Sequence, residues 1–356
     1  MKFKAWIGLT ILALGLSACS NLGSVALPPD RLAFNGSLSN SDEQQSLLNI
    51  VRLRYTDSPY FLAVNNVVSQ FNFGSSFGTN IANAAPPPAL LGSATANFNY
   101  SEAPTITYTP LQGEDYVNRL LTPIDLDVVY MLFRSGWSVH HLSPLLVQRM
   151  GEYENAVLAS RPISGRIPVY KPFKKVAGVF RHLQDAENLV ISKDRINGVF
   201  AIKVRIKHYS QLSTEDRSIL SHFGVTASSP QLWFVSTPSK EKNNVFLETR
   251  TMLGMLYYLS KGVVVPEYDI EHRQALMTYY KDGKAFDWAT VVNGVIRVRS
   301  CRSKPSNAYV AVPYRGSWFY ISQSDFNSKE TLNLLSIMMG IYQGKIQSTM
   351  PVFTVS

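Results

Sequence analysis

Side chains that could bind a metal or transfer protons occur in this sequence as short local pairs. His140 and His141 are adjacent, and neighbouring residues of a helix do not face each other, so the two imidazoles would not converge on one metal ion. The acidic pairs stand where helices are expected to begin, and there they complement the helix dipole: Glu114-Asp115 and Asp125/Asp127. The sequence has no Walker loop, HExxH, CxxC or nucleophile elbow. We therefore expect no metal and no cofactor, and we favour a protein that is not an enzyme.

A different chemistry is predicted at Cys19, one of two cysteines in the 356 residues. It follows Leu16-Ser17-Ala18, the pattern of a bacterial lipobox. In chains with that motif the bond before the cysteine is cut. The thiol then carries a diacylglyceryl group, and the new amine is acylated, typically with palmitate. The sequence therefore predicts lipid attachment at Cys19. The alternative is an ordinary secretory signal in which Cys19 is incidental.

The residues before Cys19 have the composition of an export signal. Lys2 and Lys4 precede the apolar segment 5–18, which is shorter than the roughly 20 residues of a membrane-spanning helix. Removal of residues 1–18 takes away these two lysines and lowers the formal net charge from +9 to +7. Ser20, where an aspartate would favour the inner membrane, points to the outer membrane. We expect a lipid-anchored protein that faces the periplasm, away from nucleic acid.

Basic residues cluster in two parts of the chain, and no Asp or Glu interrupts the first cluster between Arg161 and Arg181. Such surfaces can bind anionic lipid head groups, glycan phosphates or an acidic partner protein, although a solvated surface is the simpler interpretation. A cation beside an exposed aromatic ring is a further kind of binding spot. The candidate partner or anion contacts are Arg161, Arg166, Lys171, Lys174, Lys175, Arg297, Arg299, Arg315 and Trp318.

The pattern of apolar, capping and turn residues divides the chain after the signal into a tether and two α+β regions. Residues 19–40 are rich in loop formers and predict a lipidated tether. The N-terminal region, 41–164, contains a flexible loop over 74–97. Its expected elements are a helix over 41–54, a long antiparallel hairpin between Phe61 and Tyr108, two helices separated by Pro123, and a third helix that begins at Ser143.

The C-terminal region, 165–356, continues with alternating strands and helices. Its expected elements are a helix over 173–187, a half-buried strand over 198–209, a buried helix over 250–262, a strand meander between 294 and 322, a helix from Asn327 with Glu330 in a capping box, and a last strand over 351–356. Strands and helices mix without strict alternation, so the predicted fold class is α+β, with antiparallel sheets and packed helices.

Two long stretches carry a resemblance. Residues 44–71, with the motif NIVRLRY, and residues 310–340, with the motif YRGSWFYI, are similar to an uncharacterised family of proteobacterial outer-membrane lipoproteins. The resemblance covers most of the chain after the signal, and it implies a place in the envelope without implying an activity. Within these motifs we expect Arg52, Arg54 and Asp57 to form a local ion-pair cluster.

Three functions are compatible with the sequence. The first is a non-enzymatic structural or accessory subunit of a cell-envelope assembly, such as the outer-membrane complex of a secretion system. The second is a periplasmic carrier of a lipid or small ligand, and the third is an envelope-directed hydrolase. A large exposed apolar surface would favour the first, and a large cavity would favour the second.

Overall fold

The computed structural model describes residues 22–82, 91–161 and 166–343, so the signal predicted over 1–18, Cys19 and the strand predicted over 351–356 lie outside it. The chain forms two units. One, the body, contains the residues up to Pro59 and those from Val117 to Lys345, and the other, the hairpin unit, contains Tyr60–Tyr116. Helices and mostly antiparallel strands are both present, which confirms the α+β class. None of the helices in the described part combines the length and apolar character that crossing a bilayer requires.

Helix α2 (Leu22–Arg54) is longer than the helix expected over 41–54. Its C-terminal turns bury Leu47, Ile50 and Val51 at helical spacing, against helix α8 (Met252–Ser260) and strand β10 (Ala308–Tyr314). Residues 22–40, expected as a tether, continue the same helix. Once a packed segment has formed, each further residue adds a backbone hydrogen bond, which offsets weak local propensity.

The hairpin unit pairs strand β1 (Leu62–Ala82) with strand β2 (Leu91–Pro110). The antiparallel register runs from Leu62 opposite Pro110 to Ala82 opposite Leu91, with one irregularity between Val64 and Asn66. The expected hairpin is therefore confirmed, but the loop predicted over 74–97 is too long. Small residues suggested a loop there, whereas 74–82 and 91–97 are paired strand.

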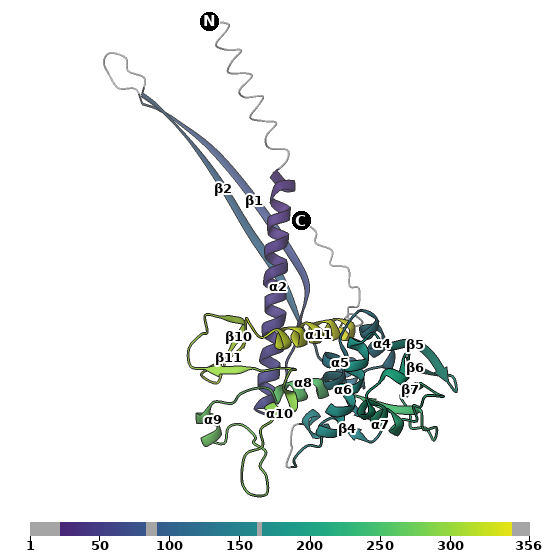
Figure 1. Cartoon of the computed structure of the whole chain (residues 1–356). Coiled ribbons are helices and arrows are strands. Elements are labelled where there is room, and N and C mark those ends of the chain that lie inside the picture. The colour runs from purple at the N-terminus through teal and green to yellow at the C-terminus, as the bar shows by residue number, and fades with distance from the viewer. Residues whose placement is uncertain (1–21, 83–90, 162–165, 344–356) are drawn as a thin grey trace. The chain divides into compact units, whose positions relative to one another are not determined.

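The larger sheet of the body has the strand order β4-β3-β8-β7-β6-β5, and among its described strands only the pair β7 and β8 is parallel. Strands β5, β6 and β7 are labelled side by side in Figure 1. Its strands are β3 (Val147–Met150), β4 (Tyr153–Glu154), β5 (Leu189–Ile196), β6 (Val199–Ile206), β7 (Gln231–Val235) and β8 (Asn244–Thr249). The sheet takes strands from both sides of the expected boundary at 164/165, which falls inside the body.

The core on this sheet combines apolar residues of the strands with one face of helix α6 (Lys171–Asp185). The helix buries Val176, Val179, Phe180 and Leu183, at the spacing that predicted it. Strand β6 buries Ile202, Val204 and Ile206, which confirms the alternation expected for a half-buried strand.

The helix predicted from Ser143 is wrong. Helix α5 (Val139–Leu146) begins earlier, and the hydroxyl of its N-cap Ser138 accepts a hydrogen bond from the amide of His140 at 3.1 Å. Pro144 lies inside this helix, and the chain then turns into β3. Pairing with β8 decides the conformation of 147–150, which local propensity could not reveal.

The second sheet of the body has the order β10-β11-β9, with β9 (Arg299–Cys301) and β11 (Ser317–Ser322). The strands expected as a meander are present, but β9 pairs with β11 and not with its neighbour in sequence. Arg315 and Gly316 both have positive φ, as the two-residue turn between β10 and β11 requires.

The remaining helices include α11 (Phe326–Gln343), close to the helix predicted from Asn327. The capping box of Asn327 and Glu330 is wrong, because the carboxylate of Asp325 accepts the amide of Ser328 at 3.2 Å. The others are α3 (Glu114–Leu121), α4 (Leu126–Arg134), α7 (Thr214–His222), α9 (Glu267–Glu271), α10 (Ala289–Val292) and the short 3-10 turns η2 (Val157–Ser160) and η3 (Tyr209–Gln211).

Candidate functional site

The first predicted basic cluster lies along and just before α6. Arg161, Arg166, Lys171 and Lys175 are exposed. The amine of Lys174 donates to the carbonyl oxygen of Thr290 at 2.7 Å, so this lysine holds α6 to helix α10. The cluster is a spread surface, with Lys174 in a structural role.

Arg315 lies at the hairpin corner between β10 and β11 and faces the end of α2. Its guanidinium is 3.0 Å from the carboxylate of Asp57 and 5.0 Å from the ring centroid of Tyr55. The same carboxylate accepts a hydrogen bond from the hydroxyl of Tyr314. This arrangement ties the chain after α2 to the small sheet, and it accounts for Arg315 without a ligand.

The local ion-pair cluster expected at the end of α2 is wrong. Asp57 pairs with Arg315, while Arg52 donates to the Asn49 side chain and Arg54 donates to the carbonyl oxygen of Leu276 at 2.6 Å. Tertiary packing offers Arg54 and Asp57 partners that are far away in sequence, while Arg52 bonds within its own helix.

Trp318 is half-buried, and its neighbour Phe319 is fully buried, as alternation along a strand predicts. The amine of Lys304 lies 5.7 Å from the Trp318 ring centroid. Trp318 and Arg315 thus have different neighbours, a lysine amine for the former and the Tyr55 ring for the latter.

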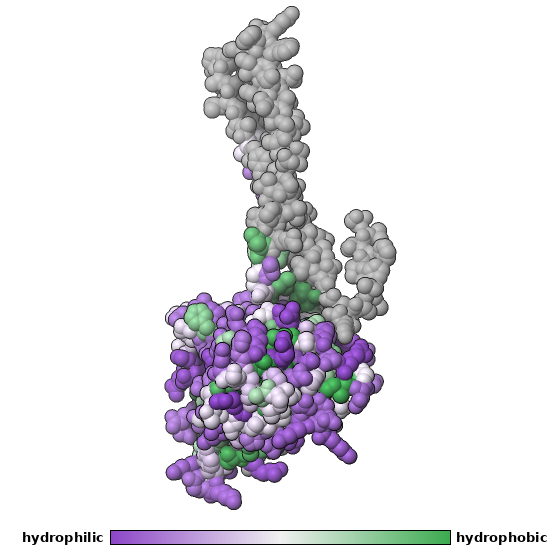
Figure 2. Space-filling view, turned by 45° about the vertical axis from the view of Figure 1, so that its right-hand side comes forward, coloured by the Kyte–Doolittle hydropathy of each residue, from purple (hydrophilic) through white to green (hydrophobic). Residues whose placement is uncertain are grey.

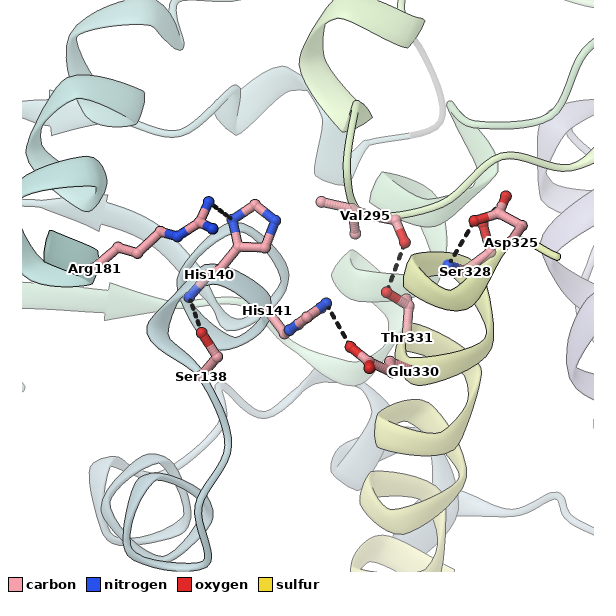
Figure 3. A network of polar contacts seen from close by, with 9 residues as sticks. All are labelled: Ser138, His140, His141, Arg181, Val295, Asp325, Ser328, Glu330 and Thr331. Carbon is pink, nitrogen blue, oxygen red and sulfur yellow. Dashed lines mark hydrogen bonds and ion pairs between the residues drawn. The ribbon is translucent and has the colours of Figure 1, made fainter. Parts of the chain in front are cut away.

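The two adjacent histidines contact different elements (Figure 3). Nε2 of His141 lies 2.8 Å from a carboxylate oxygen of Glu330 on α11, and Nδ1 of His140 lies 3.4 Å from the Arg181 guanidinium on α6. Burial and, to a lesser degree, Arg181 lower the pKa of His140. Both side chains serve packing between helices.

A cleft of about 760 Å³ lies in the body, and it brings together charged residues from five places in the sequence. Arg54, Lys261, Arg297 and Arg299 line it. Two of the nine predicted contacts, Arg297 and Arg299, therefore belong to a real cavity, and both are exposed.

Lys261 is the unusual group in this cleft. It follows α8, its side chain is only 9% exposed, and its amine lies 5.2 Å from the Trp288 ring centroid. Burial, with a smaller contribution from Arg54, lowers the pKa of this amine to about 8. It has no carboxylate within 4 Å among the residues that the structure describes.

Arg54 is the second buried cation of the cleft and is 7% exposed. One guanidinium nitrogen donates to Leu276 and another lies 3.3 Å from the sulfur of Met277, while the buried Nε has no hydrogen-bond partner in the described chain. Arg54 also lacks an acidic partner within the described ranges.

The two aspartates that line the cleft already have partners. The carboxylate of Asp325 accepts the Ser328 hydroxyl at 2.7 Å as well as its amide, and that of Asp287 accepts the amide of Ala289 at 2.9 Å. These acids stabilise helix starts. The positive charge of Lys261 and Arg54 is thus left without direct compensation.

Arg250 is a buried cation away from this cleft, and its two terminal guanidinium nitrogens have partners while its Nε has none among the described residues. The side chain is fully buried, one guanidinium nitrogen donates to the carbonyl oxygen of Asn155 at 2.6 Å, another donates to Ser160, and the group stacks 4.3 Å from the Tyr258 ring centroid. Its surroundings are closed, which makes Arg250 a structural residue.

A second cavity, of about 80 Å³, lies in the apolar core between α4, α6 and the larger sheet. Val129, Phe180 and Phe234 are among its lining residues. It is too small for a lipid chain, since ligand pockets are commonly 300–1,000 Å³. The cleft is within that range.

The described surface of the body is mostly hydrophilic in the view of Figure 2, where hydrophobic residues form small separate areas. The hairpin unit has a different pattern. The register puts Gly74, Ser76 and Gly78 on one face with Asn97 and Asn99, and all five are exposed. This face is polar and uncharged.

The positions on the opposite face of the hairpin differ in composition from this polar face. In β1, positions 71, 73, 77 and 81 are Phe, Phe, Phe and Ile, and the two other positions of that side, 75 and 79, are Ser and Thr, so the side is mainly but not wholly apolar. The register pairs positions 73, 75 and 77 with Tyr100, Phe98 and Ala96, so these positions share one face of the sheet. By sequence and register, the hairpin has one polar face and one apolar, aromatic face.

Charge is nearly absent from this unit. Between Asp57 and Glu114 the sole Asp, Glu, Lys or Arg is Glu102, in a chain of which 17% of residues are charged. This gap, together with two-residue alternation, is a sequence signal for the hairpin as a functional surface. The alternation becomes apparent only when residues 74–97, predicted as a loop, are interpreted as strand.

The sequence indicates the cleft less clearly than it indicates the hairpin. Arg297 and Arg299 stand out as a basic pair, but Lys261 and Arg54 lie far apart in sequence beside apolar residues, and only the fold brings them together. No protein-family model, curated protein or solved structure matches this chain.

Proposed function

We propose that this chain is a lipid-anchored outer-membrane protein that faces the periplasm, a non-enzymatic subunit of a cell-envelope assembly such as the outer-membrane complex of a secretion system. In this proposal Cys19 carries the lipid, and the hairpin unit is the part that contacts the bilayer and other subunits. The observation that carries the proposal is the nearly charge-free hairpin with two unlike faces.

The dimensions of the apolar face support contact with lipid. A strand rises about 3.4 Å per residue, so positions 71 to 81 extend about 34 Å. A strand of about 9–11 residues, tilted by about 45°, matches the apolar thickness of a bilayer. Glu102, the one charge, lies opposite Phe71 at the end of this stretch, where a charge can stay in the head-group region.

The strand edges support assembly with further copies. The described hairpin is a sheet of two strands, so each strand has one edge that no third strand covers. Unpaired backbone groups in lipid cost several kcal/mol each, and edge strands in water recruit other strands. A second copy of this chain offers an edge with the same uncharged alternation, which makes it the partner we propose.

The orientation of the hairpin can be tested with cysteine-attached probes. In full-length chains with Cys301→Ser, single cysteines at positions 73 to 78 are labelled with an environment-sensitive fluorophore and reconstituted into vesicles of phosphatidylethanolamine and phosphatidylglycerol. Lipids with a spin label on the acyl chain should quench probes at 73, 75 and 77 several-fold more than probes at 74, 76 and 78.

Adjacent positions serve as matched controls for each other. Quenching without a two-residue period, or no quenching at any of the six positions, would contradict insertion of the apolar face. Lipidation is tested separately, because an intact mass without acyl chains at Cys19 would remove the anchor and leave the hairpin result unaffected.

A second candidate function is a carrier of a lipid or small ligand, and one observation favours it. The cleft of about 760 Å³ is large enough for a ligand, and it has both charged and apolar walls. Within the described ranges no group of three His, Cys, Asp or Glu could hold a metal, and the hydrolase stays a third hypothesis.

A further inference from the structure

The cleft next to α8 has the features of a ligand site that is independent of the hairpin. We propose that it binds a phosphate group carried on a molecule with an apolar portion. Lys261 and Arg54 would bind the phosphate, and the wall formed by Val265, Phe286 and Trp288 would contact the apolar portion.

The argument for an anion begins with charge. Lys261 and Arg54 are both more than nine-tenths buried on the wall of one cavity, and among described residues neither has an acidic partner. Burying an ion without a counter-charge carries a large desolvation penalty. A bound anion would lower that penalty at both residues. Arg250 and Arg54 each donate to a backbone carbonyl oxygen, whereas the contact of the Lys261 amine among the described residues is the Trp288 ring.

The geometry of the donors favours a phosphate. The Nε of Arg54 is buried without a partner among the described residues, as is the Nε of Arg250, but Arg54 lines the cleft, where an oxyanion could reach this donor. Arg297 and Arg299 stand at the same cleft and add positive charge. Several converging cations match a dianionic phosphate better than a single carboxylate.

The walls of the cleft favour an amphiphile over inorganic phosphate. Val264 is 47% exposed beside the buried Val265, Phe286 and Trp288, so apolar surface lines the same space. A volume of about 760 Å³ exceeds what one phosphate ion fills. The phosphate could belong to a lipid head group or to a soluble phosphorylated molecule, and the experiment separates these sources.

Binding is measured on the full-length protein in zwitterionic detergent, in phosphate-free buffer. Thermal unfolding and calorimetric titration are followed with inorganic phosphate, with glycerol 3-phosphate and with dihexanoyl phosphatidic acid. We expect the last probe to bind at least tenfold more tightly than the first. Binding of glycerol 3-phosphate or inorganic phosphate as tightly as phosphatidic acid would contradict the apolar portion of the ligand, and binding of none of the three would overturn the proposal.

Two variants separate a binding role from a structural one. Lys261→Met keeps the apolar stem and removes the charge, so it should raise Tm without ligand and weaken binding of phosphatidic acid at least tenfold. The control is Lys304→Met, which removes another lysine beside a tryptophan and should change affinity less than twofold. If Lys261→Met lowers Tm or binds normally, Lys261 is a structural residue and the proposal fails.

Discussion

Buried cations in this protein fall into two kinds. Arg250 receives a carbonyl, a hydroxyl and an aromatic ring, so its charge is solvated by the protein. Lys261 has the ring of Trp288 and a repulsive neighbour in Arg54. This difference in partners, more than burial itself, marks Lys261 as a functional residue.

The low pKa of Lys261 predicts a pH dependence of stability. The folded chain releases this proton near pH 8, while the unfolded chain holds it up to the ordinary value of 10.5. Between these values the unfolded state binds more protons, so the free energy of unfolding should rise with pH. We expect a gain of about 1–2 kcal/mol from pH 8 to 9.5 in urea unfolding of the unliganded protein.

The comparison with Lys261→Met tests the origin of that gain. The other charged groups of the cleft are Arg54, Arg297, Arg299, Asp287 and Asp325. Because the variant lacks the Lys261 amine, its stability should change much less than that of the unmodified protein from pH 8 to 9.5. An equal rise in both proteins would assign the effect to another group.

Gly262 gives a second test at the residue scale. A Cβ there would lie 2.7 Å from the carbonyl oxygen of Ile296, because the backbone of 262–264 runs directly against 296–298. Gly262→Ala should cost about 1–3 kcal/mol by overpacking. Gly178→Ala in α6, where a Cβ meets nothing within 4 Å, should be neutral or add about 1 kcal/mol. Urea unfolding of both variants measures the contrast, and similar effects would contradict the close approach.

Residue types alone predicted part of this site. Arg297 and Arg299 could be selected because they form a dense basic pair, and both line the cleft. Lys261 lies at the end of an apolar helix, where a lysine ordinarily complements the helix dipole. Its burial depends on Trp288 and the end of α2, which are distant in sequence.

Helices and strands with a strong period were predictable at the element scale. Helix α6 and strand β6 repeat their apolar residues at 3.6 and 2 positions, and both were found as expected. The predicted secondary structure was wrong where pairing with a neighbouring strand overrides the local conformational propensity of the residues. β3 is strand because β8 lies beside it, and 74–82 is strand because β2 continues.

The start of α11 gives an element-scale test of the corrected cap. Asp325 accepts hydrogen bonds from the amide and hydroxyl of Ser328, so Asp325→Ala should lower stability by about 1 kcal/mol. Asn327→Ala, at the cap position suggested by sequence, should change stability by less than 0.5 kcal/mol. Chemical denaturation of the two variants without ligand compares them, and a larger loss for Asn327→Ala would restore the capping box.

At the scale of the whole molecule, the chain divides into a body and a hairpin inserted between Pro59 and Val117. A segment rich in proline and polar residues lies around 164/165 and predicts a domain boundary there. Such segments mark loops, but a sheet that takes strands from both sides cannot be divided at one of them.

Removing the hairpin tests this division. Val64 is paired with Tyr108, so residues 65–107 can be replaced by the turn Asn-Gly. The shortened protein should keep the Tm of the body within a few degrees, since the body has its own core. It should also sediment as single copies where the full-length protein forms larger assemblies. Loss of cooperative unfolding, or unchanged assembly, would contradict the proposed role.

Glu102 is the single charged residue of the two hairpin strands. Contacts made by these strands should therefore depend on ionic strength much less than contacts made by the body. The chain as a whole carries a formal +9, and its basic surfaces attract anions through forces that are screened over about 10 Å at 0.1 M salt. Contacts made by the hairpin involve almost no charge and resist such screening. A wash in 1 M salt would therefore release whatever the body holds electrostatically and leave in place whatever the hairpin holds.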